Sequence, residues 1–144
     1  MTASTDTCTG DNVCMSTGCT AAFPHGYLIT NLSVTAPNLK PDGMPWNSSP
    51  DGSPNLYVDI AVSGTIAKTT DVNMHSFNAT FPGPFTVSLA TGAALDVKSS
   101  ASDGGTSEVV YDCPIPTVTA AILRVRYVLC SGTGVTINYT IDPA

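Results

Sequence analysis

Apolar and polar residues alternate most regularly near the end of the chain. Between residues 135 and 141, the apolar residues Val135, Ile137, Tyr139 and Ile141 are separated by single polar residues. Because successive side chains of a β-strand point to opposite faces, this period of two places the four apolar residues on one buried face. The pattern therefore predicts a half-buried strand.

Similar alternation recurs upstream, in short runs separated by turn residues. The runs cover residues 27–35, 58–62, 85–89 and 123–129 most clearly, and residues 65–69, 74–80, 94–99 and 107–111 more weakly. No segment has a helical period long enough to predict a helix. Short alternating runs are typical of sandwiches and barrels. We therefore predict an all-β domain over residues 26–144, an antiparallel Greek-key β-sandwich of about eight strands.

Two segments lack this alternation. Residues 1–25 are rich in Thr, Ser, Gly and Cys, and we expect them to form an irregular, Cys-containing extension. Residues 36–55 contain five prolines, which cannot donate a backbone hydrogen bond to a β-ladder, so a long loop is predicted there. Because loops of this length in compact domains are usually functional or disordered, this loop is the first candidate for a binding site.

The charge balance excludes several ligand classes. Five Lys and Arg residues stand against eleven Asp and Glu, the net charge is −6, and only 11% of the residues are charged. Nucleic-acid binding and direct electrostatic binding to an anionic membrane both need a basic surface, so neither is predicted. No apolar run is long enough for a transmembrane segment. Membrane contact would therefore need a bound cation such as Ca²⁺.

The five cysteines lie near the two ends of the chain: Cys8, Cys14, Cys19, Cys113 and Cys130. Their spacing lacks the C-x2-C pattern of common zinc sites, so disulfides are favoured over a metal site. Cys113–Cys130 is the favoured disulfide, because each residue flanks a predicted strand. A second disulfide is predicted within the N-terminal trio, which leaves one cysteine over.

The composition also predicts a location. Few charges, many Thr and Asn residues and five cysteines indicate a secreted or extracytoplasmic protein, in the periplasm or at the cell surface. The first nineteen residues have neither the basic nor the apolar region of a signal peptide. We interpret the chain as a mature segment whose export signal has been removed.

Two stretches resemble the C2-domain family. Leu32-Ser-Val-Thr-Ala-Pro-Asn-Leu39, followed by Pro41-Asp-Gly and Asp51-Gly-Ser-Pro-Asn-Leu-Tyr-Val58, is similar to a C2 strand that enters an Asp-containing loop and leaves through a D-P-Y-V strand start. Residues 78–87 and Leu95-Asp-Val97 are similar to the family's N-P-x-W-N-x-x-F-x-F segment and L-x-V-x-V strand. The resemblance covers about residues 28–104. It implies a C2-like sandwich, with a jelly-roll-like one as the alternative.

A looser similarity is to C2-like modules of secreted bacterial lipoproteins. These modules carry a G-x-x-W-D motif, to which Gly43-Met-Pro-Trp46-Asn47 corresponds. The similarity agrees with the extracytoplasmic location that the composition predicts.

The resemblance also implies a Ca²⁺ site, because C2 domains that bind this ion share it between Asp side chains of two loops. The corresponding positions hold Asp42 or Asp51, Asn55 and Asp103, while a further family aspartate is Ala101. Ca²⁺ takes about six to eight oxygen ligands, so Ca²⁺ dependence is expected to be weak or lost, and no other cofactor is predicted. Alternatively the three aspartates, each followed by Gly, are turn residues.

Within the long loop, Met44, Trp46 and Asn47 form the predicted binding site. An aromatic residue at a loop tip inserts into a membrane interface or stacks on a sugar. The alternative is that Trp46 folds back and covers the open end of the sandwich.

Three functional hypotheses follow. The first is a non-catalytic extracytoplasmic binding or adhesion module whose loop at residues 36–55 contacts a protein or glycan at the cell surface, or another copy. The second is a structural subunit of a surface assembly or filament whose arm, residues 1–25, contacts a neighbouring chain, as the odd cysteine suggests. The third is a secreted hydrolase, which has little support because His25 and His75 lie in no catalytic motif. We therefore predict that the protein is not an enzyme.

Overall fold

The computed structural model describes residues 7–47 and 51–144. Within these ranges, strands and one short helix follow in this order: β1 (Asn12–Met15), β2 (Gly18–Ala21), β3 (His25–Thr35), β4 (Asn55–Val62), β5 (Thr65–Thr69), β6 (Asn78–Phe81), β7 (Phe85–Leu89), β8 (Leu95–Asp103), β9 (Thr106–Ile115), α1 (Ala120–Val125), β10 (Tyr127–Gly132) and β11 (Val135–Pro143). None of the described helical segments is long and apolar enough to cross a membrane.

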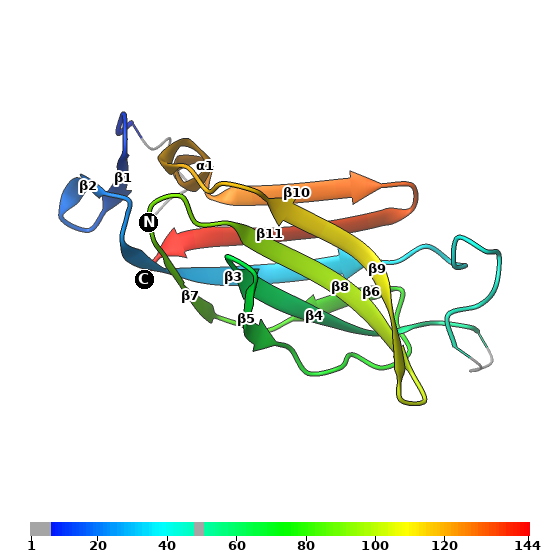
Figure 1. Cartoon of the computed structure of the whole chain (residues 1–144). Helices are drawn as coiled ribbons and strands as arrows, with labels where there is room; N and C mark the ends of the chain where they lie inside the picture. Colours follow the sequence, from blue (N-terminus) through cyan, green and yellow to red (C-terminus); the bar gives the residue numbers. More distant parts are fainter. Residues whose placement is uncertain (1–6, 48–50) are drawn as a thin grey trace.

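Two antiparallel sheets form the body of the molecule (Figure 1). The four-stranded sheet has the order β5-β4-β8-β9. In the five-stranded sheet, β10, β11 and β3 lie side by side, and β6 and β7 both pair with β3, one with each half of that strand. The predicted antiparallel sandwich is therefore confirmed, with nine strands after the N-terminal segment.

The core lies between the two sheets, and the apolar residues that the alternation predicts to be buried point into it. Val135, Ile137, Tyr139 and Ile141 are all buried, as are the inward residues of the other long strands. Burial raises the pKa of Tyr139, whose hydroxyl has no hydrogen-bond partner among the described residues. The last strand thus contributes one complete face to the core.

The strand predicted at residues 123–129 is wrong in its first half, where the structure has the helix α1. The Thr119 hydroxyl accepts a hydrogen bond from the backbone N–H of Ile122 and caps the helix. Leu123 is buried, and Arg126 ends the helix in the left-handed conformation (φ 65°). A helix of six residues is too short to show a period of 3.6 against a two-residue alternation, which explains the error.

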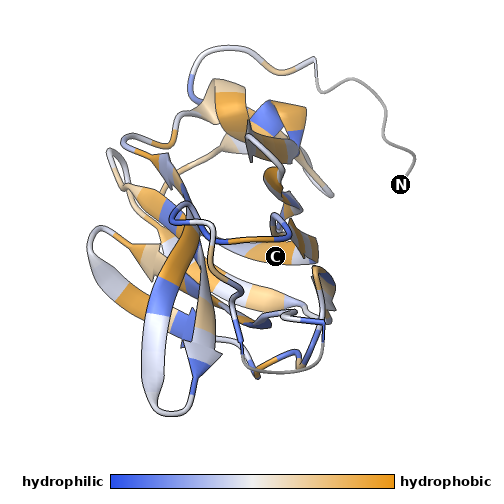
Figure 2. Cartoon of the chain, turned by 90° about the vertical axis from the view of Figure 1, so that its right-hand side faces the viewer, coloured by the Kyte–Doolittle hydropathy of each residue, from blue (hydrophilic) through white to orange (hydrophobic). Residues whose placement is uncertain are grey.

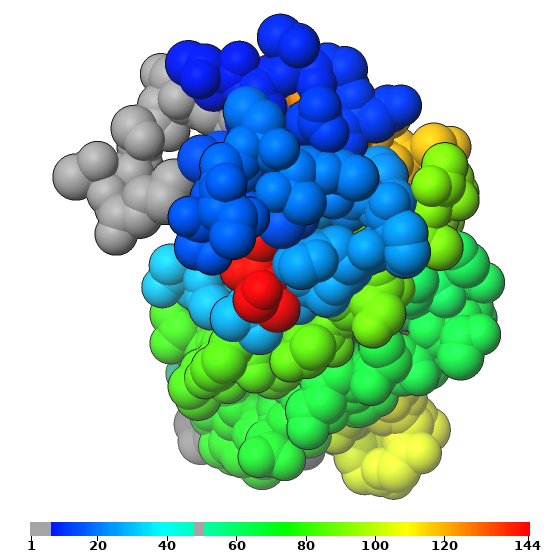
Figure 3. All heavy atoms as spheres, turned by 90° about the vertical axis from the view of Figure 1, so that its left-hand side faces the viewer, coloured from blue at the N-terminus to red at the C-terminus, as the bar shows by residue number. Residues whose placement is uncertain are grey.

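The N-terminal extension is not irregular throughout. Residues 12–21 form a hairpin of β1 and β2, and Val13 and Ala22 are buried in the same core as the sandwich. Strands of four residues, with Val13 as the buried apolar residue of the pair, leave no alternation to recognise. The hairpin packs beside the C-terminus of the chain (Figure 3).

Both disulfide predictions are confirmed. Cys113–Cys130 joins the edge strands β9 and β10 of the two sheets. The pair within the N-terminal trio is Cys8–Cys19, which closes the hairpin. Cys14 belongs to neither disulfide.

Candidate functional site

Four connections lie at the end of the sandwich away from the hairpin (Figure 1), which faces the viewer in Figure 2. One is the short β10–β11 turn at residues 133–134. The others are residues 36–54 between β3 and β4, residues 70–77 between β5 and β6, and residues 104–105 between β8 and β9. This end contains most of the site residues that the sequence predicts. We call it the loop end.

Backbone hydrogen bonds fix the connection at residues 70–77 to both ends of the long loop. The Ala36 N–H donates to the Phe77 carbonyl at 2.8 Å. Leu56 and Asn73 exchange two hydrogen bonds of 2.9 and 2.7 Å. The two connections therefore hold a fixed position relative to each other.

Asn55 positions the same connection from within the sandwich. Its side chain is 8% exposed, and its Oδ1 accepts a hydrogen bond of 3.0 Å from the backbone N–H of His75. His75 has a φ of 50°, which interrupts the strand predicted at residues 74–80, so that β6 begins only at Asn78. The Asn55 amide thus serves as a structural acceptor.

Asp42 and Asp51 are turn residues. The Asp42 Oδ1 accepts from the Met44 N–H at 2.9 Å. The Asp51 Oδ1 accepts from the Ser53 N–H at 3.0 Å and from its hydroxyl at 2.6 Å. Carboxylates that accept from a backbone N–H two residues later stabilise tight turns. The turn alternative is therefore the one that the structure favours.

A cation of the chain itself lies near the remaining carboxylates. Lys40 Nζ is 2.5 Å from Glu108 Oε1 on β9. This hydrogen bond raises the pKa of Lys40, and the charges of Asp42 and Asp103 act in the same direction. The ion pair also ties the long loop to the β8–β9 hairpin.

The described residues include no group of three or more His, Cys, Asp or Glu side chains placed to hold a metal ion. The structure therefore does not bring Asp42, Asp51 and Asp103 together as ligands, and it engages the Asn55 oxygen elsewhere. The Lys40 ammonium already balances part of the negative charge at this end.

Trp46 covers the end of the sandwich rather than standing at the loop tip. Its side chain is 3% exposed, and its Nε1 donates a hydrogen bond of 2.8 Å to the Pro37 carbonyl. Of the predicted binding-loop residues, Met44 is 58% exposed and Asn47 is partly buried. Trp46 therefore acts as an internal anchor that shapes the loop.

Four large apolar side chains remain exposed at the loop end. Leu39 and Met44 lie on the long loop, and Val72 and Met74 lie on the connection hydrogen-bonded to it, with exposed fractions between 42% and 59%. We call these four residues the loop-end surface. The sequence did not predict the exposure of Val72 and Met74, because Val72 lies outside the predicted strands and Met74 begins a weakly alternating run at residues 74–80.

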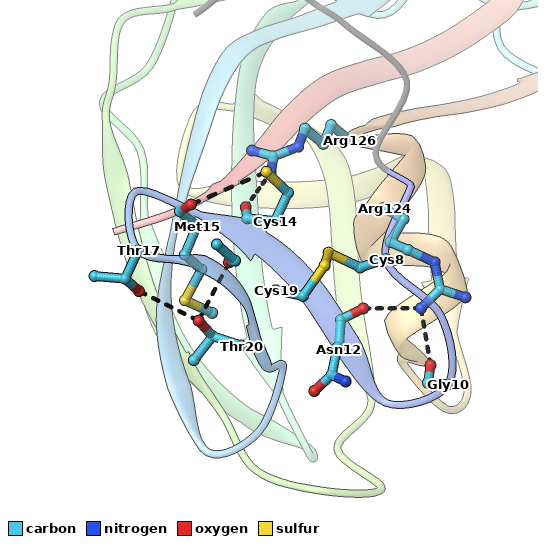
Figure 4. Close-up of a disulfide and its surroundings, with 11 residues drawn as sticks. Cys8, Gly10, Asn12, Cys14, Met15, Thr17, Cys19, Thr20, Arg124 and Arg126 are labelled. Atoms are coloured by element: carbon cyan, nitrogen blue, oxygen red, sulfur yellow. Dashed lines mark hydrogen bonds between the residues drawn. A yellow bond between two sulfur atoms is a disulfide. The ribbon is translucent and has the colours of Figure 1, made fainter.

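The opposite end of the sandwich is fastened by two arginines (Figure 4). Arg124 Nη1 donates to the carbonyls of Gly10 and Asn12 at 2.8 and 2.9 Å. Arg126 Nη2 donates to the carbonyl of Cys14 at 2.5 Å. Both arginines thus hold the N-terminal hairpin against its own chain. An arm that contacts a neighbouring chain stays a prediction.

Comparison with known proteins identifies the architecture. No protein-family model and no curated protein matches the sequence. A solved structure of a C2 domain matches with a TM-score of 0.62 and 15% identity, covering 83% of this chain and 97% of that one.

Two further solved structures agree with this comparison. A single C2 domain of plant extended synaptotagmin 1 matches with a TM-score of 0.57 and 11% identity, covering 84% of this chain and 96% of that one. A structure of extended synaptotagmin 2 that contains an SMP domain and two C2 domains matches with a TM-score of 0.58 and 15% identity, covering 85% of this chain and 28% of that one. The chain therefore has a C2-like fold, while the similarity to bacterial lipoprotein modules stays a prediction.

Proposed function

We propose that this C2-like sandwich is a non-catalytic, extracytoplasmic binding or adhesion module that contacts a protein at the cell surface through its loop-end surface. The observation that carries the proposal is the exposure of Leu39, Met44, Val72 and Met74 on two connections that hydrogen bonds hold together. Exposed apolar side chains on a fixed surface are typical of interaction sites.

The charges around this surface favour a protein partner. Asp42, Asp71 and Asp103 lie in or beside these connections. Of the two lysines nearby, Lys40 is paired with Glu108, and Lys68 lines a pocket together with Asp71 and Val72. An apolar surface with carboxylates at its rim complements a protein that presents apolar and basic side chains. An anionic membrane would be repelled unless Ca²⁺ were bound.

The two disulfides support the extracytoplasmic location. Cys8–Cys19 and Cys113–Cys130 are both formed. Such bonds persist in oxidising compartments and are rare in reducing ones. A protein that works outside the cytoplasm is therefore the interpretation that agrees with the cysteine chemistry.

The test measures binding of fluorescently labelled protein to intact cells of its source, before and after mild protease treatment of those cells. We expect saturable binding that protease treatment abolishes. Because the loop-end surface supplies the apolar contact, Leu39→Ser/Met44→Ser/Met74→Ser should weaken binding about tenfold or more. The control Val125→Ser/Leu129→Ser removes two similarly exposed apolar side chains from α1 and β10 and should bind like the wild type.

Equal binding by the loop-end variant and the control would contradict the proposal. Vesicles of phosphatidylcholine with phosphatidylserine provide a second measurement, with Ca²⁺ or with EDTA. We expect no binding in either condition. Ca²⁺-dependent vesicle binding would replace the protein partner with a lipid one.

A further inference from the structure

The five-stranded sheet is interrupted on one side of β3. β6 ends at Phe81, opposite Leu32, and β7 begins at Phe85, opposite Ile29. The three residues between them, 82–84, are Pro-Gly-Pro. Because proline has no backbone N–H, the ladder cannot continue along this link. The sequence Phe-Pro-Gly-Pro-Phe therefore leaves a gap at the edge of the sheet, between β6 and β7, which both pair with β3.

The glycine lets the link pass close to the sheet. A Cβ atom at Gly83 would lie 2.8 Å from the Ile29 carbonyl oxygen, which is too close for any other residue. The link therefore follows the sheet closely, with a proline on each side of the glycine. Both Pro82 and Pro84 are exposed.

β3 is irregular at the same place. Asn31 has a φ of 53° in the middle of the strand, and the register with β11 shifts opposite it. Its Nδ2 donates to the Thr140 hydroxyl at 3.3 Å, and that hydroxyl is 2.5 Å from the Thr30 hydroxyl. Bulges and strained residues of this kind re-aim side chains and are frequent next to functional sites. Two neighbouring strands thus help to fix the amide of Asn31.

The gap and the bulge form a groove of about 480 Å³. It is lined by Thr30, Asn31, Leu32, Ser33, Thr80 and the Phe81–Pro84 segment. Ser33 and Thr80 are opposite each other in the ladder, and their hydroxyls have no hydrogen-bond partner within the described residues. The groove therefore offers free hydroxyl groups beside exposed proline rings.

The five-stranded sheet itself carries almost no charge, although Lys68 and Asp71 line the pocket that adjoins the groove at Thr80, Phe81 and Pro82. The strands of the five-stranded sheet contain one charged residue, Asp142, which is paired with Arg126. The strands of the four-stranded sheet contain seven: Asp59, Lys68, Asp96, Lys98, Asp103, Glu108 and Asp112. None of the groove residues is charged. A charged ligand would find no counter-charge in the groove.

We propose that this groove binds a neutral oligosaccharide. Hydroxyl and amide groups pair with sugar hydroxyls, and the pyrrolidine rings of Pro82 and Pro84 contact the apolar C–H faces of the sugar. A purely apolar ligand would cover the hydroxyls of Ser33 and Thr80 without giving them a hydrogen-bond partner, which costs free energy. The groove volume lies in the range of ligand sites. The groove lies beside Val72 of the loop-end surface, because Thr80, Phe81 and Pro82 line a neighbouring pocket together with Val72. The proposal still does not depend on the proposed protein contact, because Leu39, Met44 and Met74 line neither pocket.

The test is a titration of ¹⁵N-labelled protein with neutral hexasaccharides of glucose, mannose, xylose and N-acetylglucosamine, and with an anionic galacturonate hexasaccharide. We expect at least one neutral sugar to shift the amide signals of residues 30–33 and 80–81, and the anionic one to leave them unchanged. Asn31→Gly keeps the left-handed backbone and removes the amide. It and Thr80→Ala should each weaken binding about tenfold.

Thr86→Ala is the matched control, because Thr86 is an exposed threonine of β7 outside the groove, and it should bind like the wild type. The variant Leu39→Ser/Met44→Ser/Met74→Ser should also retain sugar binding, which separates this proposal from the proposed protein contact. Thermal melts verify that each variant is folded. The proposal is overturned if no neutral sugar shifts these amides, if the two groove variants bind normally, or if a proline-rich peptide is the only probe that shifts them.

Discussion

The two ends of the sandwich are held by different interactions. At the hairpin end, a disulfide and two arginine side chains fasten β1 and β2 to their own chain. At the loop end, turn hydrogen bonds, a buried indole and one exposed ion pair hold the connections, and no described disulfide reaches them. The hairpin end is thus fixed by covalent and charged contacts, and the loop end by local ones.

This difference suggests where the chain can bind a partner. The carbonyls of Gly10, Asn12 and Cys14 at the hairpin end are occupied by arginine donors. Leu39, Met44, Val72 and Met74 at the loop end stay exposed although their backbone is fixed. A fixed surface with exposed apolar side chains loses little entropy on binding. We therefore expect substitutions at the two ends to act differently on stability and on binding.

The largest effect is expected at the loop end from Trp46→Ala. This change removes a buried indole and its hydrogen bond to the Pro37 carbonyl, so the free energy of unfolding should fall by about 3–4 kcal/mol. Urea unfolding measures this free energy, and amide exchange should increase in residues 36–47. Trp46→Phe keeps most of the bulk and should cost much less. A loss for Trp46→Ala no larger than for Trp46→Phe would show that the indole does not anchor the loop.

Removing the disulfide of the hairpin end should be second in size. Cys8→Ser/Cys19→Ser removes a cross-link between residues that are 11 positions apart in the sequence. The loop-closure entropy of such a cross-link predicts that the free energy of unfolding falls by about 3 kcal/mol or less. The effect should be local, with faster amide exchange in β1 and β2 and unchanged exchange at the loop end. Faster exchange at both ends would contradict the independence of the two ends.

Arg126→Gly should give a smaller effect at the same end. Glycine suits the left-handed backbone, so this variant isolates the loss of the guanidinium contacts to Cys14 and Asp142. Hydrogen bonds to charged groups contribute about 1.5–3 kcal/mol, and exposure reduces that contribution here to about 1–2 kcal/mol. Limited proteolysis of residues 9–22 should accelerate. If the variant resists proteolysis as well as the wild type does, Arg126 does not hold the hairpin in place.

A pH effect is expected from Asp96, in the half of the four-stranded sheet nearer the hairpin end. Burial, followed by a hydrogen bond with Asp112, raises the pKa of Asp96 to about 6. Because this folded-state pKa exceeds the unfolded value of about 3.9, the protonated carboxyl stabilises the fold below pH 4, and this contribution is lost as the pH rises through 6. Its size, reduced for solvent screening, is on the order of 1 kcal/mol.

The measurement for Asp96 is a series of melts between pH 4 and pH 8. Asp96→Asn stays neutral throughout and should therefore melt a few degrees above the wild type at pH 8 but not at pH 4. Asp59→Asn is the matched control, because Asp59 is a carboxylate on the neighbouring strand β4 of the same sheet, and its pH profile should follow the wild type. Identical pH profiles for wild type and Asp96→Asn would assign the pH dependence to other groups.

The smallest effect is expected from Ca²⁺ at the loop end. A bound ligand raises the melting temperature, by an amount that grows with its concentration relative to the dissociation constant. Because the described residues assemble no metal-ligand group, melts in millimolar Ca²⁺ and in EDTA should coincide. A clearly higher melting temperature in Ca²⁺ than in EDTA would support the Ca²⁺ site that the C2 resemblance implies, provided that Asp42→Asn and Asp103→Asn abolish the difference.

Much of the fold was predictable because it depends on local pattern. The alternation of β11 predicts one apolar face, and its four apolar residues are all buried. The Cys113–Cys130 pair was predicted from its position beside two predicted strands, although the two cysteines meet because edge strands of different sheets pack together. The segment from Thr119 to Val125 could not be predicted in this way. A two-residue alternation and a short helix give the same sequence pattern there, and only the Thr119 cap and the buried Leu123 distinguish them.

The candidate site was predictable only in part. The prolines at positions 37–54 place the long loop correctly, and the Asp-Gly pairs correctly suggested turns at Asp42 and Asp51. The exposure of Val72 and Met74 was not predictable, because it depends on hydrogen bonds between connections that are far apart in sequence. The orientation of Trp46 stayed open for the same reason.

The order and composition of the residues were enough to predict most strands, the Cys113–Cys130 disulfide, a second disulfide somewhere among the three N-terminal cysteines, the long loop and the acidic net charge. These features follow from side-chain period, backbone restriction by proline and net charge, all of which are properties of neighbouring residues or of composition. Three other features required the folded chain: which side chains stay exposed at the loop end, how the arginines hold the hairpin, and that a Pro-Gly-Pro link lies opposite the bulge at Asn31. These features depend on contacts between segments that fold together but lie far apart along the chain.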